Sequence, residues 1–100
     1  MSGDLKAVLA AIVTAVRSHK EAKKIILFGS RARGDAVRTS DIDIAIVDPR
    51  WTRQDINTVH DELEETLAVP FTFDLLGYDL LTKDSLKERI QREGIVIHER

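Results

Sequence analysis

The chain contains no cysteine and no long apolar run. Without cysteine there is no disulfide framework, no zinc–thiolate site and no thiol nucleophile. The longest apolar stretches fall well short of the roughly 20 residues that a membrane-spanning helix needs. Met1–Asp4 also carries no basic segment of the kind that opens a secretory signal. These absences favour a cytoplasmic protein.

An excess of basic residues is lacking as well. Lysine and arginine number 15 against 17 aspartates and glutamates, which gives a formal net charge of -2. Because proteins with an extended nucleic-acid surface are usually basic, no such surface is expected. The arginines are nevertheless unevenly spread, since Arg31, Arg33 and Arg38 follow one another closely. This local positive charge suits a metal–polyphosphate ligand better than a polynucleotide backbone.

The length of 100 residues predicts one domain over residues 1–100. Apolar periodicity and turn residues predict, in chain order, a helix over 4–19, a strand over 24–29, a short helix over 30–34, a loop over 35–40, a strand over 41–47, a helix from 51 or 52 to 67, a strand over 69–76, a helix over 82–92 and a strand over 95–97. Ser30 and Thr82 are the expected N-caps, and Gly94 is the expected glycine after the last helix. This order predicts an α/β layer fold.

The polar residues around the first two strands constrain the topology. Gly29 and Ser30 follow the first apolar strand, whereas Asp41 and Asp43 stand at the beginning of the second. If these residues act on one ligand, the two strand ends must lie at the same edge of the sheet. The strands would then run antiparallel. We therefore expect a mixed sheet of about four strands with helices packed on it.

Asp41 and Asp43 form the first candidate metal site. Their i, i+2 spacing on a strand places both carboxylates on the same face. Two ionised carboxylates at such positions repel one another unless a cation lies between them. Mg²⁺ provides that charge and prefers oxygen ligands. In the alternative interpretation, Asp41 caps a turn and Asp43 is a solvated strand residue.

Asp74 is a third candidate. Phe73 and Leu75 flank it within a predicted buried strand, where an ionised group is costly unless it is paired or bound to metal. A carboxylate aimed at the same ion would act as the base or orient the attacking hydroxyl. In the alternative, Asp74 lies at a partly exposed strand end and pairs with a nearby arginine.

Gly29 and Ser30 are candidates for phosphate binding. A small Gly-Ser pair at a strand-to-helix turn offers backbone N–H groups and a hydroxyl to phosphate. Arg33 follows Ser30 by three residues, close to one helical turn, so it can reach a phosphate at the start of that helix. The alternative for Arg33 is a solvated surface position. The three histidines are far apart in sequence and match no metal-ligand spacing.

The run Ile25-Ile26-Leu27-Phe28-Gly29-Ser30-Arg31-Ala32-Arg33-Gly34, followed by Ser40-Asp41-Ile42-Asp43-Ile44-Ala45, resembles the minimal nucleotidyltransferase (MNT) family of the polymerase beta nucleotidyltransferase superfamily. The resemblance implies a mixed-sheet fold that binds ATP and two Mg²⁺ ions. It also implies roles by motif position, with the metal held by Asp41, Asp43 and Asp74 and the distal phosphates held by Gly29, Ser30 and Arg33. An acceptor hydroxyl would attack the α-phosphorus in line and release pyrophosphate.

The resemblance further implies a protein partner. Larger relatives append domains that hold the acceptor, whereas only one predicted helix and one strand follow Asp74 here. We therefore expect another chain or an assembled dimer to bring the acceptor. In the MNT family this chain is often a small helical HEPN protein, frequently a toxin, and the MNT protein then resembles an antitoxin that in some systems adenylylates a tyrosine of the toxin. Two alternatives stay open, namely a non-catalytic antitoxin that masks a HEPN partner by contact and a transferase for a small molecule.

Overall fold

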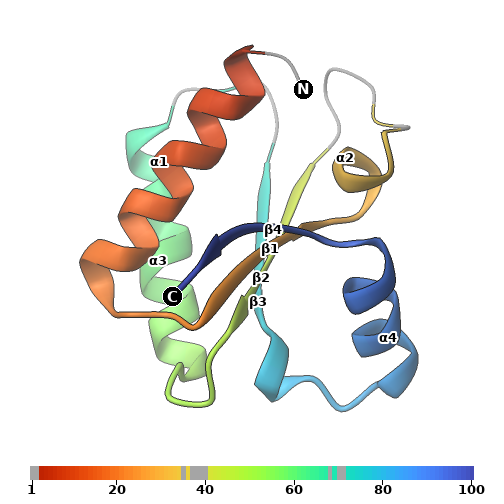
Figure 1. Ribbon diagram of the computed structural model, residues 1–100. Coiled ribbons are helices and arrows are strands. Elements are labelled where there is room, and N and C mark those ends of the chain that lie inside the picture. Colours follow the sequence, from red (N-terminus) through yellow and green to blue (C-terminus); the bar gives the residue numbers. More distant parts are fainter. Residues whose placement is uncertain (1–2, 35, 37–40, 68, 70–71) are drawn as a thin grey trace.

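The computed structural model describes residues 3–34, 36, 41–67, 69 and 72–100. In chain order its elements are α1 (Gly3–His19), β1 (Lys24–Phe28), α2 (Ser30–Arg33), β2 (Ile42–Val47), α3 (Arg53–Thr66), β3 (Phe73–Gly77), the short 3-10 helix η1 (Tyr78–Leu80), α4 (Asp84–Glu93) and β4 (Ile95–Glu99) (Figure 1). The predicted order of helices and strands is confirmed. Most of the predicted loop over 35–40 lies outside the described residues, as does part of the predicted start of the third strand.

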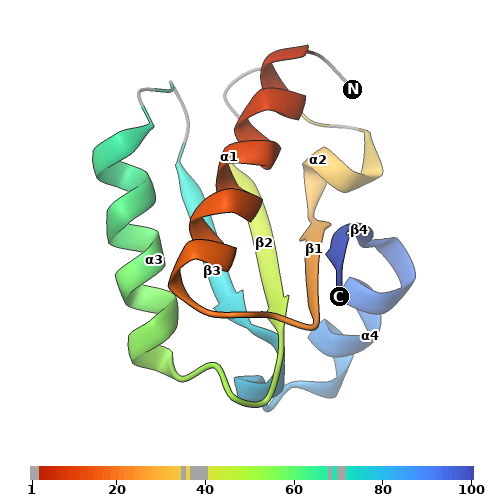
Figure 2. The same cartoon turned by 60° about the vertical axis from the view of Figure 1, so that its left-hand side comes forward.

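The four strands form one mixed sheet in the order β3-β2-β1-β4 (Figure 2). β1 runs antiparallel to both β2 and β4, and β2 runs parallel to β3. The antiparallel arrangement expected for the first two strands is therefore confirmed. It brings the end of β1 beside the beginning of β2, because Phe28 pairs with Asp43. The helix α3 makes the crossover that a parallel β2–β3 pair requires.

The larger part of the core lies between the sheet and the helices α1 and α3, which cover the same face (Figure 1). The alternating residues Ile42, Ile44 and Ile46 of β2 are fully buried there. Trp51, in the loop before α3, is buried in this core, and its indole N–H donates to the carbonyl oxygen of Glu21 at 2.8 Å. Such burial supplies most of the driving force that holds the helices on the sheet.

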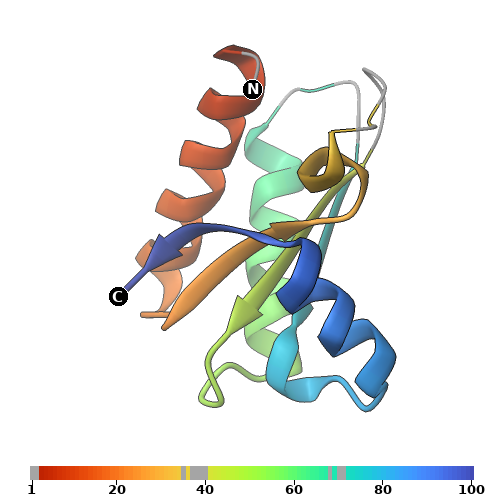
Figure 3. The same cartoon turned by 45° about the vertical axis from the view of Figure 1, so that its right-hand side comes forward.

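The opposite face of the sheet is covered differently. A smaller apolar cluster, formed by Ile26, Phe28, Ala45 and Ile90, packs under α4. α4 lies against the part of the sheet where β2 ends, and α2 borders the part where β1 ends and β2 begins (Figure 3). The predicted burial of β1 on both faces follows from this arrangement, since each face of β1 contacts one of the two clusters.

Two of the predicted N-caps are wrong. Gly29, not Ser30, is the N-cap of α2, and Ser30 is the first residue of that helix. α4 begins at Asp84 after Lys83, so Thr82 lies too early to cap it. In both helices the N-cap residue makes no side-chain capping hydrogen bond. Neither helix start is therefore stabilised by the side chain of its N-cap residue.

The role expected for Gly94 also needs correction. Gly94 does follow α4, but its φ of -71° is accessible to any residue, so it is not the left-handed cap that glycine usually provides. A Cβ atom at this position would collide with the carbonyl oxygen of Ile90 and with Cγ2 of Ile26. Glycine is required here because the chain passes very close to its neighbours as it turns from α4 into β4.

The boundaries of α3 agree with the sequence to within a residue. Thr52 is its N-cap, and a reciprocal capping box joins the Thr52 hydroxyl to the Asp55 amide at 3.2 Å and the Asp55 carboxylate to the Thr52 amide at 2.8 Å. β3, in contrast, begins at Phe73, which is later than predicted. Among the described residues, no helix has both the length and the apolar character needed to cross a membrane.

Candidate active site

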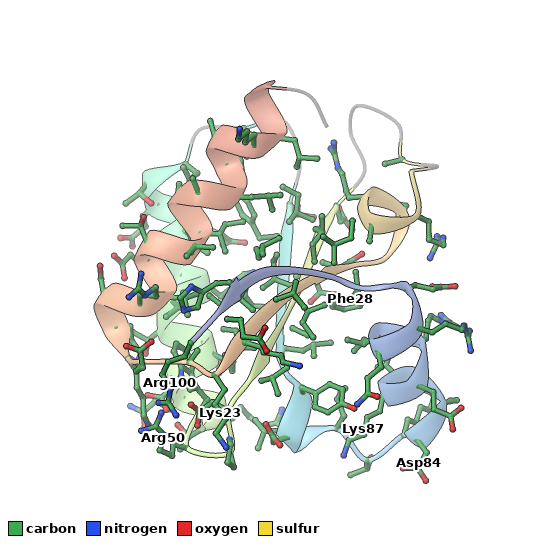
Figure 4. All side chains as sticks on the ribbon, in the orientation of Figure 1. Lys23, Phe28, Arg50, Asp84, Lys87 and Arg100 are labelled. Carbon is green, nitrogen blue, oxygen red and sulfur yellow. The ribbon has the colours of Figure 1, made fainter. Side chains whose placement is uncertain are left out.

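The three aspartates that were predicted to act together lie on one face of the sheet. Asp43 is the second residue of β2, and the parallel register places it directly opposite Asp74 of β3. Asp41 immediately precedes β2 rather than lying within it. Because alternate residues of a strand share a face, all three point to the side covered by α4. Phe28, the antiparallel partner of Asp43, marks this side in Figure 4.

Asp74 differs from its prediction in burial. Its side chain is exposed, although its neighbours Phe73 and Leu75 are buried. The reason is that β3 is an edge strand and that its two faces are covered unequally. The buried neighbours point toward α3, while Asp74 points to the face that carries the other carboxylates. The cost of burying an ionised group therefore does not arise here.

Gly29 lies against the carboxylate of Asp43. Its φ of +77° falls in the left-handed region, where a residue with a side chain is strained. A Cβ atom at Gly29 would also collide with Oδ2 of Asp43. The strand-to-helix turn and the aspartate are thus in direct contact. Glycine is therefore favoured at this position both by the backbone conformation and by the space that the carboxylate occupies.

The electrostatic environment of Asp43 is unfavourable for a bare carboxylate. Partial burial raises the pKa of Asp43, and the nearby carboxylates of Asp74 and Asp41 raise it further. The guanidinium of Arg33 acts in the opposite direction and lowers this pKa. Three like charges on one face attract a cation, which would relieve both the repulsion and the cost of burial. Carboxylate oxygens are also the ligands that Mg²⁺ prefers.

Arg33 lies on α2 between the carboxylate cluster and the end of α4. Its Nη1 atom is 3.7 Å from Oε2 of Glu93, and its charge also acts on Asp43. Arg33 is exposed, with 39% of its side chain accessible to solvent, so the solvated position considered as an alternative stays open. Ser30 is half-buried at the first position of the same helix. The proposed contacts of Ser30 and Arg33 with phosphate stay predictions.

A residue that the sequence analysis missed, Thr72, contacts the cluster directly. Its hydroxyl donates a hydrogen bond to Oδ1 of Asp41 at 2.5 Å, and its carbonyl oxygen accepts one from the amide of Ile42 at 3.0 Å. The available signal was the i, i+2 spacing between Thr72 and Asp74, which places both on the same face. Thr72 therefore belongs to the site as the structure assembles it.

His60, Asp61 and Glu64 form a second group of metal-ligating side chains. Their ligand atoms lie within 4.8 Å of one another on α3. Spacing among the three histidines could not reveal this group, because its sequence signal is the i, i+4 spacing of His60 and Glu64. Nε2 of His60 already contacts the carbonyl oxygen of Phe73 at 2.9 Å, and Asp61 and Glu64 are exposed. Since α3 covers the other face of the sheet, this group is separate from the aspartates.

Comparison with known proteins places these features in context. The family described as "Polymerase beta, Nucleotidyltransferase" matches residues 10–100. No curated protein sequence matches the chain. A chain from a crystal structure of a toxin–antitoxin complex with AMP-PNP has 22% identity and a TM-score of 0.78, covering 92% of this chain and 73% of its own length.

Two further solved structures share the fold. A minimal nucleotidyltransferase has 29% identity and a TM-score of 0.72, and the match covers 92% of this chain and 91% of that one. A chain from a structure of a tri-AMPylated Shewanella oneidensis HEPN toxin in complex with an MNT antitoxin has 18% identity and a TM-score of 0.67, and the match covers 95% of this chain and 72% of that one. These likenesses confirm the predicted fold class. Because the family match spans nearly the whole chain, including every predicted site residue, the protein belongs to the polymerase beta nucleotidyltransferase family.

Proposed function

We propose that this protein is a Mg²⁺-dependent nucleotidyltransferase that transfers AMP from ATP to a hydroxyl group of a partner protein. The observation that carries the proposal is the convergence of Asp41, Asp43 and Asp74 on one sheet face, with Gly29 pressed against Asp43. This places a strand-to-helix turn suited to phosphate beside carboxylates suited to a divalent cation. Membership of the nucleotidyltransferase family supports the same chemistry.

The residues present fit the proposed metal. All three carboxylates offer oxygen donors, and the raised pKa of Asp43 reflects a concentration of negative charge that a cation would neutralise. Asp41 and Asp43 would hold two ions, and Asp74 would hold the one at the reacting phosphate. When bound, Mg²⁺ neutralises phosphate charge and lowers the pKa of a coordinated hydroxyl.

The protein's own groups then have distinct tasks. Gly29 and Ser30 would bind the distal phosphates through backbone N–H groups and the serine hydroxyl, and Arg33 would balance their charge. Asp74 would orient the acceptor hydroxyl, whose oxygen forms a new bond to the α-phosphorus. The bond between the α- and β-phosphates breaks, pyrophosphate leaves, and Asp74 or solvent receives the proton. Because Asp74 is exposed on an edge strand, a large acceptor can approach it.

The acceptor that we propose is a small helical HEPN-type protein, which the chain would neutralise as an antitoxin in the cytoplasm. Support comes from the structures that share the fold, since one is a toxin–antitoxin complex with AMP-PNP and another contains a tri-AMPylated HEPN toxin with an MNT antitoxin. Retention of all three carboxylates on one face favours catalysis over neutralisation by contact alone.

Labelling with α-³²P-ATP and Mg²⁺ in an extract of the source organism tests the proposal. We expect one labelled protein band with the wild-type chain and none with Asp41→Asn/Asp43→Asn. Asp79→Asn is a matched control, because Asp79 is an exposed aspartate in η1, outside the site. Mass spectrometry then identifies the modified protein and the modified hydroxyl.

The outcomes separate the alternatives. Label in RNA or in a small molecule would keep the nucleotidyltransferase activity and overturn the protein acceptor. If no label is transferred, and Asp43→Asn still neutralises a co-expressed HEPN partner that it binds, the chain acts by contact and the catalytic proposal is wrong.

A further inference from the structure

Four polar side chains occupy neighbouring positions on the site face of β2 and β3. Continuing the register of Asp43 opposite Asp74 by two residues places Asp41 opposite Thr72, in agreement with the hydrogen bond from the Ile42 amide to the Thr72 carbonyl. Three corners of this arrangement are carboxylates and the fourth is a hydroxyl. The carboxylates have a proposed role in metal binding, whereas the hydroxyl has none.

We infer that Thr72 is a positioning residue whose hydroxyl holds the Asp41 carboxylate in the orientation in which it binds metal. The inference rests on the proposed function, because it takes Asp41 to be a metal ligand. Its direct basis is the 2.5 Å hydrogen bond from the Thr72 hydroxyl to Oδ1 of Asp41.

Asp41 needs such a partner more than Asp43 does. Asp43 lies within β2 and against Gly29, so its strand and its contact with the turn restrict its carboxylate. Asp41 precedes the strand and is exposed, and an exposed aspartate samples several rotamers. Asp41 also shares a face with two other carboxylates, and mutual repulsion favours rotamers that turn its charge away from the point where a cation would be shared.

Thr72 is well placed to counter both effects. Its main chain is tied to the residue after Asp41, since the Thr72 carbonyl accepts from the Ile42 amide at 3.0 Å. Its branched Cβ limits the rotamers of the hydroxyl itself. The hydrogen bond draws the Asp41 carboxylate across from β2 toward β3, which is the strand that carries Asp74. A carboxylate accepts several bonds, so the contact with Thr72 leaves acceptor positions for a cation.

A structural role alone would predict a different pattern of effects. Both Thr72 and Asp41 are exposed, so water can replace the hydroxyl when it is removed. The thermal midpoint should therefore change by no more than about 4 °C. Removal of a group that orients a metal ligand typically weakens metal affinity about 10- to 100-fold. A large loss of metal affinity with a small loss of stability is the signature of positioning.

The test measures Mn²⁺ binding by electron paramagnetic resonance, with and without a non-hydrolysable ATP analogue. Thr72→Val removes the hydroxyl and keeps the shape, and Thr72→Ser keeps the hydroxyl. Thr14→Val is the matched control, because the Thr14 hydroxyl bonds to the Ala10 carbonyl on the exposed side of α1. Asp41→Asn reports the full loss of this ligand's charge.

We expect Thr72→Val to bind Mn²⁺ about 10- to 100-fold more weakly than the wild type. Thr72→Ser and Thr14→Val should stay close to the wild type. Equal affinity of Thr72→Val and the wild type, with Asp41→Asn impaired, would overturn the positioning role and leave the proposed function intact. Equal weakening by Thr72→Val and Thr72→Ser would overturn it too, because the methyl group rather than the hydroxyl would then matter. If the wild type and Asp41→Asn bind Mn²⁺ alike, the proposed metal site itself is wrong.

Discussion

The contact between Gly29 and Asp43 allows a prediction in which strain and site geometry separate. Gly29→Ala introduces a side chain at a φ of +77°, which costs about 1–2 kcal/mol of folding free energy. The new Cβ atom would also collide with Oδ2 of Asp43. This oxygen is the tip of a flexible side chain, so rotation of Asp43 relieves the collision without unfolding. We therefore expect a modest loss of stability and a large loss of metal binding.

Gly34→Ala is a matched control at the other end of α2, where Gly34 is the C-cap. Gly34 has a φ of +85°, but a Cβ atom there meets no atom within 4 Å among the described residues. Both variants should lose about 1–2 kcal/mol in urea unfolding, which for a domain of this size lowers the thermal midpoint by roughly 4–16 °C. Only Gly29→Ala should also weaken Mn²⁺ and ATP binding, because only there is a proposed ligand displaced.

The assay is isothermal titration calorimetry with Mn²⁺ and with an ATP analogue, beside urea unfolding of each variant. Adding Asp43→Ala to both glycine variants completes the comparison, since removal of the carboxylate abolishes the collision and should make the two glycine positions equivalent. If Gly29→Ala binds Mn²⁺ as tightly as Gly34→Ala while Asp43→Ala is impaired, the close approach of the turn to the carboxylate has no functional consequence, and the reasoning is refuted.

Three other predictions concern single charged groups. The raised pKa of Asp43 means that the folded state holds the Asp43 proton more tightly than the unfolded state, so the stability that this proton contributes is lost as pH rises from the unfolded pKa of 3.8 through the folded value. Asp43→Asn should therefore have a higher melting temperature than the wild type at pH 7. Added Mg²⁺ should raise the melting temperature of the wild type only. The Arg50 side chain donates to both carboxylate oxygens of buried Asp48, at 3.0 and 2.7 Å, and holds the pKa of Asp48 well below its usual range. The stability from this lowered pKa is present above pH 3.8 and lost on acidification, so Asp48→Asn should cost about 1.5–3 kcal/mol of folding free energy at pH 7. In urea unfolding at a series of pH values, Asp48→Asn should lose less stability on acidification than the wild type, and an equal loss would contradict the assignment. Arg33→Ala should weaken binding of the ATP analogue by about 1.5–3 kcal/mol in calorimetry and leave the melting midpoint nearly unchanged, because its ion pair with Glu93 at 3.7 Å is partly exposed; unchanged affinity would remove Arg33 from the phosphate site.

Local pattern was sufficient for most of the secondary structure and for the shared face of two residues of the candidate site. Apolar periodicity placed the helices and strands, because burial of one stripe or one face imposes that period directly on the chain. The i, i+2 spacing of Asp41 and Asp43 already determined that they share a face. Their position after the Gly29-Ser30 turn also led to the antiparallel β1–β2 pair, since ligand contacts from both segments require neighbouring strand ends.

Contacts between segments distant in sequence were not readable in this way. Nothing near Asp74 specifies that it lies opposite Asp43, because that register depends on how α3 packs as it connects β2 to β3. The exposure of Asp74 likewise depends on its place on an edge strand, where the apolar residues beside it point to the opposite face. Its flanking residues predicted burial because hydrophobicity along a strand does not show which face is covered.

The sequence by itself determined the family motif, the order of elements and the shared face of Asp41 and Asp43, because each of these is encoded within a few residues along the chain. Only the tertiary structure decided that Thr72 bonds to Asp41, that Arg33 lies beside Glu93 and that Gly94 has no room for a side chain. These relations depend on strand register and helix packing. They arise from the sum of many weak contacts across the whole core, which no short segment of sequence records.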